Sequence, residues 1–169
     1  SGVTLTIEPG VTVKFDSGKV MFVEGTLVAR GASASTITFT SSAASPAVGD
    51  WWYIEFKAGS TGTTFNGDGD YVSGSIFEHC RVEYGGSYEG VVVIGVPYIN
   101  SCTFTNNFGD GVVGAYRSGP VKITNSTFTQ NDAVAIYNPS DATITGNTIT
   151  YNKQGIVGGD TFYTLTCLH

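Results

Sequence analysis

Short runs of alternating apolar and polar residues recur in the second half of the chain. Thr103-Phe104-Thr105 returns as Thr127-Phe128-Thr129 and again as Thr148-Ile149-Thr150. Alternation with a period of two predicts a β-strand with one buried face. The copies lie 24 residues apart (104 to 128) and then 21 residues apart (128 to 149). A repeat of this length is typical of a solenoid, in which each coil must offer the same shape to its neighbour.

The repeat also predicts which side chains stack inside the solenoid. Coils stacked in register pair each strand with its copies above and below, so the inward positions should form ladders along the axis. One expected ladder contains Val82, Phe104, Phe128 and Ile149, and the other contains Phe77, Ile99, Ile123 and Ile144.

Two kinds of corner follow from the same alignment. The residues expected to point inward are odd-numbered up to Ile99 and even-numbered from Cys102, which predicts a corner near Ser101. The equivalents of Ser101 are His79, Asn125 and Gly146. At a second corner Asn recurs, as Asn107, Asn131 and Asn152. We expect each stacked Asn amide to bond the turn backbone and the Asn of the next coil, and Asn also tolerates the left-handed conformation of such corners.

The first half of the chain is less regular but contains similar short alternating runs, such as residues 3–7 and 11–15, separated by Gly or Pro. Longer loops are expected at residues 41–50 and 58–73. The sequence therefore predicts one all-β solenoid domain over residues 1–169, with roughly seven coils and two loop insertions. At the ~4.8 Å spacing of paired strands it would be about 35 Å long.

Composition and charge narrow the possible roles. Only 13% of the residues are charged, the net charge is −6, and the eight Lys and Arg residues are scattered along the chain. A nucleic-acid-binding protein needs a basic stripe to neutralise phosphates, so we expect no nucleic-acid partner. No apolar run approaches the ~20 residues of a membrane span.

Several segments resemble a known family, namely LTIEPGVTVKF (5–15), VEGTLVARG (23–31), GDWWYIEF (49–56), YVSGSIFEHCRVEYGG (71–86) and PYINSCTFTNN (97–107). They are similar to the single-stranded right-handed parallel β-helix of the pectate lyase-like superfamily, and in particular to β-helix modules of bacterial surface and secreted proteins. The resemblance implies an extracellular or cell-surface module, as in adhesins. We expect this chain to be part of a larger protein, in contact with neighbouring β-helix coils or associating end to end.

The resemblance does not imply an activity, because that superfamily includes lyases, hydrolases and adhesins. The Asn-Thr-Asp, Asp-Asp and Gly-His-Gly signatures of its galacturonan hydrolases do not occur in this sequence. Candidate catalytic residues are Arg81, Glu83, Asp110 and Arg117, but a solvated charged face is the better interpretation. With two His residues and no metal-ligand spacing, a zinc site is not expected.

One motif suggests a calcium site. Asn66, Asp68 and Asp70 place oxygen ligands at positions 1, 3 and 5 of a calcium loop. The motif departs from the EF-hand pattern after that, since Tyr71 stands where Gly is needed and Phe77 where the bidentate Glu should be. A Gly/Asp turn in a surface insertion is the favoured alternative to Ca²⁺ binding.

A second motif suggests carbohydrate binding. Trp51, Tyr53 and Glu55 should point to one side of a strand, and Trp52, Ile54 and Phe56 to the other (all from the run 51–56). Outward aromatic rings on a rigid sheet can stack on the apolar faces of sugars. The alternative is that Trp51 packs beneath the 41–50 loop.

Two features support weaker hypotheses. The stacked Thr-x-Thr runs are compatible with ice binding, although Arg81 and Glu83 interrupt them and outward Thr is common in sheets. Cys80 and Cys102 should stack on adjacent coils as buried thiols, while Cys167 stands alone in this scheme.

Our prediction is a non-catalytic β-helix module that acts as a structural or adhesive scaffold and binds polysaccharide or a cell-surface glycan. A polysaccharide-active lyase or hydrolase is the alternative.

Overall fold

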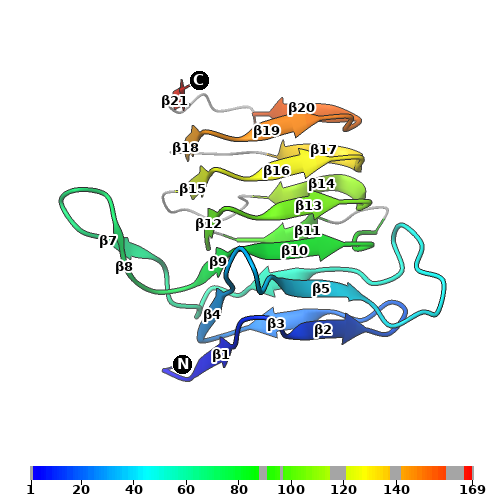
Figure 1. The fold of residues 1–169 in the computed structure, drawn as a ribbon, viewed down its shortest axis with the longest axis horizontal. Coiled ribbons are helices and arrows are strands. Elements are labelled where there is room, and N and C mark those ends of the chain that lie inside the picture. Colours follow the sequence, from blue (N-terminus) through cyan, green and yellow to red (C-terminus); the bar gives the residue numbers. More distant parts are fainter. Residues whose placement is uncertain are drawn as a thin grey trace.

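The structure, a computed structural model, describes residues 2–87, 91–95, 97–114, 121–137, 142–158 and 166–168. The described residues contain strands and no helix, and the strands stack in parallel as a β-solenoid of about six turns (Figure 1). This confirms the predicted fold class, with a coil number close to the predicted seven.

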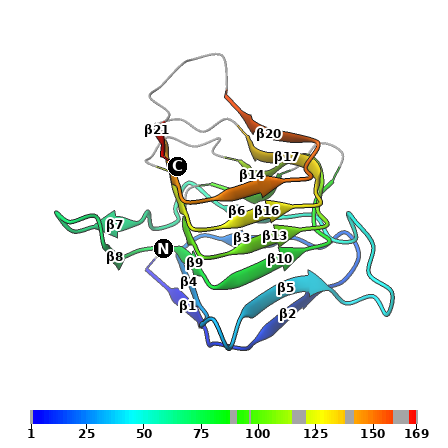
Figure 2. The ribbon, with the colours of Figure 1, turned by 45° about the horizontal axis from the view of Figure 1, so that its top comes forward.

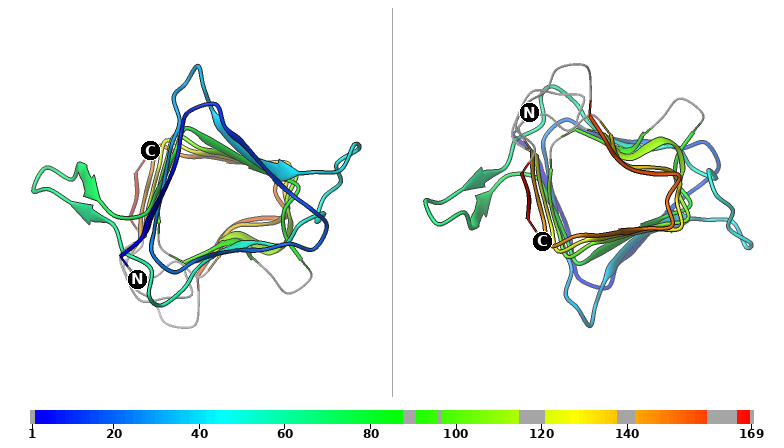
Figure 3. Two further views of the ribbon diagram at one scale, coloured as in Figure 1. Left: turned by 90° about the horizontal axis from the view of Figure 1, so that it is seen from below. Right: turned by 90° about the horizontal axis from the view of Figure 1, so that it is seen from above.

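Each complete coil supplies one strand to each of three parallel sheets, which enclose a triangular core (Figure 3). Sheet A contains β1 (Thr4–Ile7), β4 (Thr26–Arg30), β9 (Ile76–Glu78), β12 (Tyr98–Asn100), β15 (Val121–Thr124), β18 (Ala142–Thr145) and β21 (Thr166–Leu168). Sheet B contains β2 (Thr12–Phe15), β5 (Ile37–Ser41), β10 (Cys80–Glu83), β13 (Thr103–Thr105), β16 (Thr127–Thr129) and β19 (Thr148–Thr150). Sheet C contains β3 (Met21–Val23), β6 (Ile54–Phe56), β11 (Val91–Ile94), β14 (Phe108–Gly114), β17 (Asp132–Tyr137) and β20 (Gln154–Val157).

A short antiparallel hairpin interrupts the solenoid within the predicted 58–73 loop. It consists of β7 (Thr64–Phe65) and β8 (Tyr71–Ser73), lies between β6 of sheet C and β9 of sheet A, and projects from the body (Figures 1 and 2). An isolated two-stranded hairpin is at best marginally stable in water, so its stability must come from packing on the solenoid.

Both predicted apolar ladders are confirmed by the strand register. Val82 pairs with Phe104, Phe104 with Phe128, and Phe128 with Ile149. The second ladder pairs Phe77, Ile99, Ile123 and Ile144 in that order. The rings of Phe104 and Phe128 stack with 4.8 Å between centroids and 2° between planes. Equivalent side chains therefore pack on one another from coil to coil in the apolar core.

The predicted corner between sheets A and B is also confirmed. Positive φ angles occur at His79 (48°), Ser101 (53°), Asn125 (52°) and Gly146 (66°). At this corner the chain turns in one residue, and the left-handed conformation there costs a non-glycine residue about 1–2 kcal/mol. Polar residues occupy three of the four positions because their side chains tolerate this conformation better than β-branched ones do.

The Asn ladder between sheets B and C forms as expected. Asn107 Nδ2 donates to Asn131 Oδ1 at 3.0 Å, and Asn131 Nδ2 donates to Asn152 Oδ1 at 2.7 Å. The same amides also donate to backbone carbonyls of the preceding coil, as Asn131 Nδ2 does to Phe104 O at 3.1 Å. The expected left-handed conformation lies one residue earlier than the ladder, at Asn106, Gln130 and Tyr151.

A second side-chain ladder, which the sequence did not predict, runs along the corner between sheets A and B. The backbone N–H of Cys80 donates to Cys102 Sγ at 3.4 Å, and that of Cys102 donates to Ser126 Oγ at 3.0 Å. The N–H of Ser126 donates in turn to Asn147 Oδ1 at 2.8 Å. Cys80 and Cys102 are buried free thiols, as predicted, and here they serve as hydrogen-bonding groups of the corner.

Candidate functional site

The β7–β8 hairpin packs on the outer face of sheet A through aromatic rings. Phe65 meets Tyr98 edge-on at 5.2 Å between centroids, and Tyr71 stacks over Tyr98 at 6.3 Å. We call Phe65, Tyr71 and Tyr98 the aromatic cluster. Ile76 lies between Val28 and Tyr98 in the strand register, on the outer face, yet it is fully buried. The loop insertion therefore covers part of sheet A with a small apolar layer of its own.

Lys122 fixes the tip of the hairpin to the solenoid. Its Nζ donates to Gly69 O at 2.6 Å, across 53 residues of sequence. The same ammonium lies 4.4 Å from the centroid of Phe65 and 5.4 Å from that of Tyr98. Cation–π contacts of this kind are worth about 0.5–1 kcal/mol at exposed sites, so Lys122 joins the turn, the aromatic cluster and β15.

Beside the aromatic cluster, four polar side chains form a hydrogen-bonded chain across four consecutive coils. Arg30 Nε donates to Glu78 Oε2 at 2.7 Å. Asn100 Nδ2 donates to Glu78 Oε1 at 3.0 Å, and Thr124 Oγ1 donates to Asn100 Oδ1 at 2.8 Å. We call Arg30, Glu78, Asn100 and Thr124 the polar strip. Their positions follow from the register, because each comes directly after an inward ladder residue.

The polar strip and the aromatic cluster touch each other. The Tyr98 hydroxyl lies 3.1 Å from Thr124 Oγ1, and the Arg30 guanidinium lies 5.4 Å from the centroid of the Tyr71 ring. Burial raises the pKa of Tyr71, so its hydroxyl stays protonated and donates to Gly74 O at 2.8 Å. Apolar ring faces and paired hydrogen-bonding groups thus lie side by side on sheet A.

Glu78 is the carboxylate of the polar strip, and its environment keeps it ionised. Burial alone would raise the pKa of Glu78, but hydrogen bonds from Arg30 and Asn100 outweigh burial and hold the pKa below its ordinary value. A general acid needs the opposite shift, towards neutral pH. The arrangement is therefore suited to accepting hydrogen bonds from a ligand and poorly suited to protonating one.

Of the predicted catalytic candidates, the structure brings Arg81 and Glu83 together and places Asp110 on a different sheet. Arg81 and Glu83 form an ion pair on sheet B, with 2.6 Å between Nε and Oε2, and Thr40 Oγ1 donates to Glu83 Oε1 at 3.1 Å. Asp110 is exposed on β14 of sheet C. Arg117 lies outside the described residues. The pair is partly exposed, with 42% of the Arg81 side chain and 14% of the Glu83 side chain accessible.

The predicted calcium motif forms the turn of the β7–β8 hairpin. Asn66 Oδ1 accepts hydrogen bonds from the backbone N–H groups of Asp68 and Asp70, at 3.0 and 2.8 Å. Within the described ranges, no group of three or more His, Cys, Asp or Glu side chains is placed to hold a metal ion. The Lys122 ammonium bonded to Gly69 O puts a positive charge at this turn, which opposes a second cation.

The predicted sugar-stacking role of Trp51 is wrong, because Trp51 is fully buried and offers no face to a ligand. Its ring stacks on Phe15 at 4.3 Å, and its Nε1 donates to Glu83 O at 2.9 Å. Trp51 sits in an isolated bridge with Gly85, ahead of β6, so the alternation of β6 does not extend to it. Trp52 is the exposed neighbour, with 47% of its surface accessible.

Tyr53 and Glu55, the other two residues of that prediction, belong to a small patch on sheet C. Phe22 is 51% exposed and its ring lies 6.3 Å from that of Tyr53. Lys57 Nζ lies 4.1 Å from the centroid of Phe22 and is ion-paired with Glu55. The patch combines one exposed ring with a neutralised charge pair.

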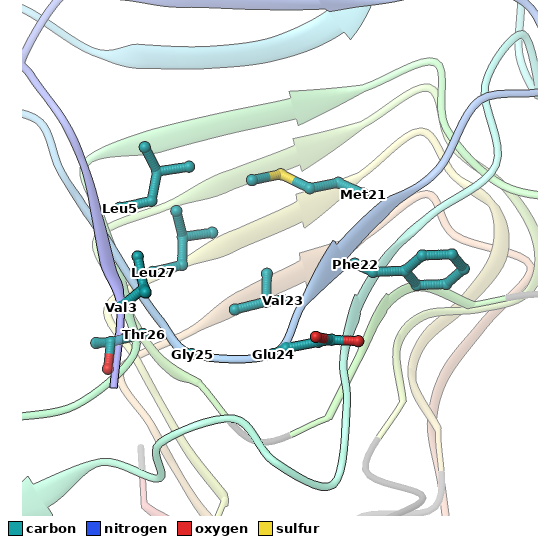
Figure 4. A pocket seen from close by; sticks show the side chains of 9 residues that line it. All are labelled: Val3, Leu5, Met21, Phe22, Val23, Glu24, Gly25, Thr26 and Leu27. Atoms are coloured by element: carbon teal, nitrogen blue, oxygen red, sulfur yellow. The ribbon is translucent and has the colours of Figure 1, made fainter. Parts of the chain in front are cut away.

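Two further surfaces, a hollow near β1–β3 and the Thr-x-Thr runs of sheet B, are candidate sites because of their shape and regularity. At the coil of β1–β3, a hollow of about 140 Å³ is lined mainly by apolar side chains, among them Leu5, Met21 and Leu27 (Figure 4).

The Thr-x-Thr runs stack in register on sheet B, as predicted. However, Thr40 and Thr105 are buried on either side of Glu83, so the hydroxyls do not form one flat exposed array.

Comparison with known proteins gave one match. A family model described as a right-handed β-helix region matches residues 24–167 of the 169-residue chain. No curated protein and no solved structure gave a significant match. No helix that could cross a membrane is found in the described part of the chain.

Proposed function

Since the chain belongs to the right-handed β-helix family, we propose that it is a non-catalytic scaffold module that binds polysaccharide on sheet A. The observation that carries the proposal is the polar strip, hydrogen-bonded across four coils beside the aromatic cluster. Carbohydrate sites combine ring faces, which cover the apolar side of a sugar, with fixed donors and acceptors for its hydroxyls. Tyr98 contributes to both, through its ring and its hydroxyl.

Binding without catalysis is the better proposal for this site. Glycoside hydrolysis needs two carboxyl groups, one of which must be protonated at working pH. The polar strip supplies one carboxyl group, that of Glu78, and its pKa is lowered. The rigid stacking of coils favours a role as a spacer or adhesive scaffold, and we place the module outside the cell or on its surface, as part of a larger protein.

The patch on sheet C is a second candidate surface for the same role. The observation that favours it is the exposed Phe22 ring next to Tyr53. Among the described residues of sheet C, no row of hydrogen-bonding groups extends from this patch over several coils, so we rank it below sheet A. Calcium bound by Asn66, Asp68 and Asp70 would stabilise the hairpin turn that carries part of the aromatic cluster.

The proposal is tested by native electrophoresis through gels that contain polysaccharides, with Ca²⁺ or with EDTA. We expect retardation of the wild-type chain and no release of reducing ends or unsaturated uronates. Tyr98→Ala removes a ring of sheet A, while the matched variant Tyr53→Ala removes a ring of sheet C. Loss of retardation only in Tyr98→Ala supports the proposed site.

Three other outcomes have defined meanings. Loss only in Tyr53→Ala moves the site to sheet C. Product release contradicts the non-catalytic assignment. Retardation that disappears in EDTA and returns with Ca²⁺ would assign the turn at residues 66–70 a metal after all.

A further inference from the structure

Both cations near the polar strip, Arg30 and Lys122, already have partners within the protein. Arg30 is paired with Glu78 at 2.7 Å, although half of the Arg30 side chain is exposed. Lys122 donates to a backbone carbonyl and lies over two aromatic rings. Arg30 is therefore paired with a carboxylate, and Lys122 is held by a carbonyl oxygen and two rings. The second oxygen of Glu78 accepts a hydrogen bond from Asn100.

The surrounding charge is unfavourable for an acidic ligand. Asp68 and Asp70 flank Gly69, the residue whose carbonyl binds Lys122. The whole chain carries a net charge of −6. A polyanion that approaches sheet A would therefore meet the net negative charge of the chain, while Arg30 and Lys122, the two cations described beside the strip, are already engaged; both effects slow its association and weaken its binding.

The hydrogen-bonding groups of the strip fit hydroxyls better than carboxylates. A sugar hydroxyl both donates and accepts, and so does the amide of Asn100, while the buried hydroxyl of Thr124 holds that amide in place. A carboxylate only accepts, so it would leave the oxygen atoms of Glu78 and Asn100 facing acceptors. Arg30 can bind one ligand oxygen with its remaining N–H groups while its Nε stays on Glu78.

We propose that the polar strip binds a neutral, linear polysaccharide whose chain runs along the axis of the solenoid. This inference rests on the proposed function and adds the ligand class and its direction. The direction follows from the register, since the three partly exposed residues of the strip, Arg30, Glu78 and Asn100, lie on β4, β9 and β12, which are neighbours in sheet A, whereas Thr124 on β15 is buried. Successive groups are thus spaced at about 4.8 Å along one line, and only an extended chain parallel to the axis can contact all of them.

The test measures affinity for neutral polymers (mixed-linkage β-glucan, galactomannan, arabinoxylan) and for acidic ones (polygalacturonate, alginate). We expect binding to at least one neutral polymer, with less than about a twofold change in affinity between low salt and about 1 M NaCl, where charges are screened beyond about 3 Å. Binding to the acidic polymers only, or a steep loss of affinity with salt, would overturn the inference and leave the proposed function standing. Binding to neither class would overturn the proposed function itself.

Two charge variants make the test specific to the strip. Glu78→Gln leaves Arg30 without its carboxylate, so we expect this variant to gain salt-sensitive binding to polygalacturonate. Glu83→Gln is the matched control, because it frees Arg81 from an ion pair of the same type and similar exposure on sheet B. An equal gain in both variants, or none in Glu78→Gln, would contradict the assignment of ligand class to this strip.

The length of the bound chain tests its direction. Asn100→Ala removes a central group of the strip and should weaken binding of a long oligosaccharide by about three- to tenfold, the value of one hydrogen bond. Affinity should rise with oligosaccharide length until the chain spans the strip. An affinity that is already complete with a monosaccharide would contradict an axial chain, and circular dichroism of Asn100→Ala establishes that the variant is folded.

Discussion

Trp51 and Trp52 are neighbours in the chain and lie in opposite environments. Trp51 is buried against Phe15 and donates to the carbonyl of Glu83, whereas Trp52 is about half exposed next to Gly18. Strict alternation along 51–56 would place Trp51 with Tyr53 and Glu55. The chain reaches β6 only at Ile54, and the corner before it resets the direction of the side chains.

This difference predicts very different costs of truncation. We expect Trp51→Ala to lower the free energy of unfolding by about 3–5 kcal/mol, because it opens a large cavity and leaves Glu83 O without its donor. The matched variant Trp52→Ala should cost less than about 1 kcal/mol. Urea unfolding followed by circular dichroism measures both. Similar losses in the two variants would show that Trp51 is not the buried member of the pair.

Glu78 should make the stability depend on pH in a defined window. Because folding lowers its pKa, the carboxylate stabilises the folded chain above its unfolded pKa, and this contribution is lost as the pH falls through the lower folded pKa. Wild type should therefore exceed Glu78→Gln in urea midpoint at pH 6, and the difference should shrink as the pH falls below about 4. A difference that stays constant down to pH 2 would contradict the lowered pKa.

At the scale of elements, the ladders and corners could be predicted because they repeat. The inward Phe and Ile residues, the positive φ at Ser101 and its equivalents, and the Asn ladder all follow from one alignment of the chain with itself. Parallel stacking brings equivalent residues of neighbouring coils into contact, so a periodic pattern in the sequence predicts which residues touch.

The features that do not repeat could not be predicted in this way. Lys122 meets Gly69 across 53 residues, and the hairpin that carries Gly69 occurs in one coil among those described. The ladder of Cys80, Cys102, Ser126 and Asn147 was hidden for another reason, since its members differ in type while sharing the role of hydrogen-bond acceptor. The strand register pairs Glu78 with Asn100, but only the hairpin shows that they border an aromatic surface.

The Asn ladder should be most important in the middle of its length. Asn131→Ala leaves the N–H of Asn107 and the carbonyl of Phe104 buried without these partners, so we expect a loss of about 2–5 kcal/mol. Asn152→Ala at the next coil should cost less, because Asn152 is only partly buried. Thermal unfolding of both variants is the measurement. An equal or larger loss in Asn152→Ala would show that burial does not set the cost.

For the whole molecule, the buried thiols report whether the coils unfold together. Cys80 and Cys102 lie in the third and fourth coils, and a mutual hydrogen bond together with burial raises the pKa of Cys80. Both should react with a thiol reagent only when these coils open. In a Cys167→Ser background, we expect the reaction rate in increasing urea to follow the global unfolding transition. Fast reaction under native conditions would instead show that neighbouring coils open independently, as a one-dimensional array can.

The hydrogen bonds between one Asn and the next in the ladder all point the same way along the axis. In each rung the amide of one coil donates to the Asn of the next coil, while that Asn reaches back to a carbonyl of the coil before it. A new coil therefore closes its corner against one that is already formed, and the earlier coil acts as a template. Since a ribosome releases the lower coils first, the chain can grow its solenoid rung by rung during synthesis. The finished rod would then preserve the direction of translation in the orientation of its side-chain amides.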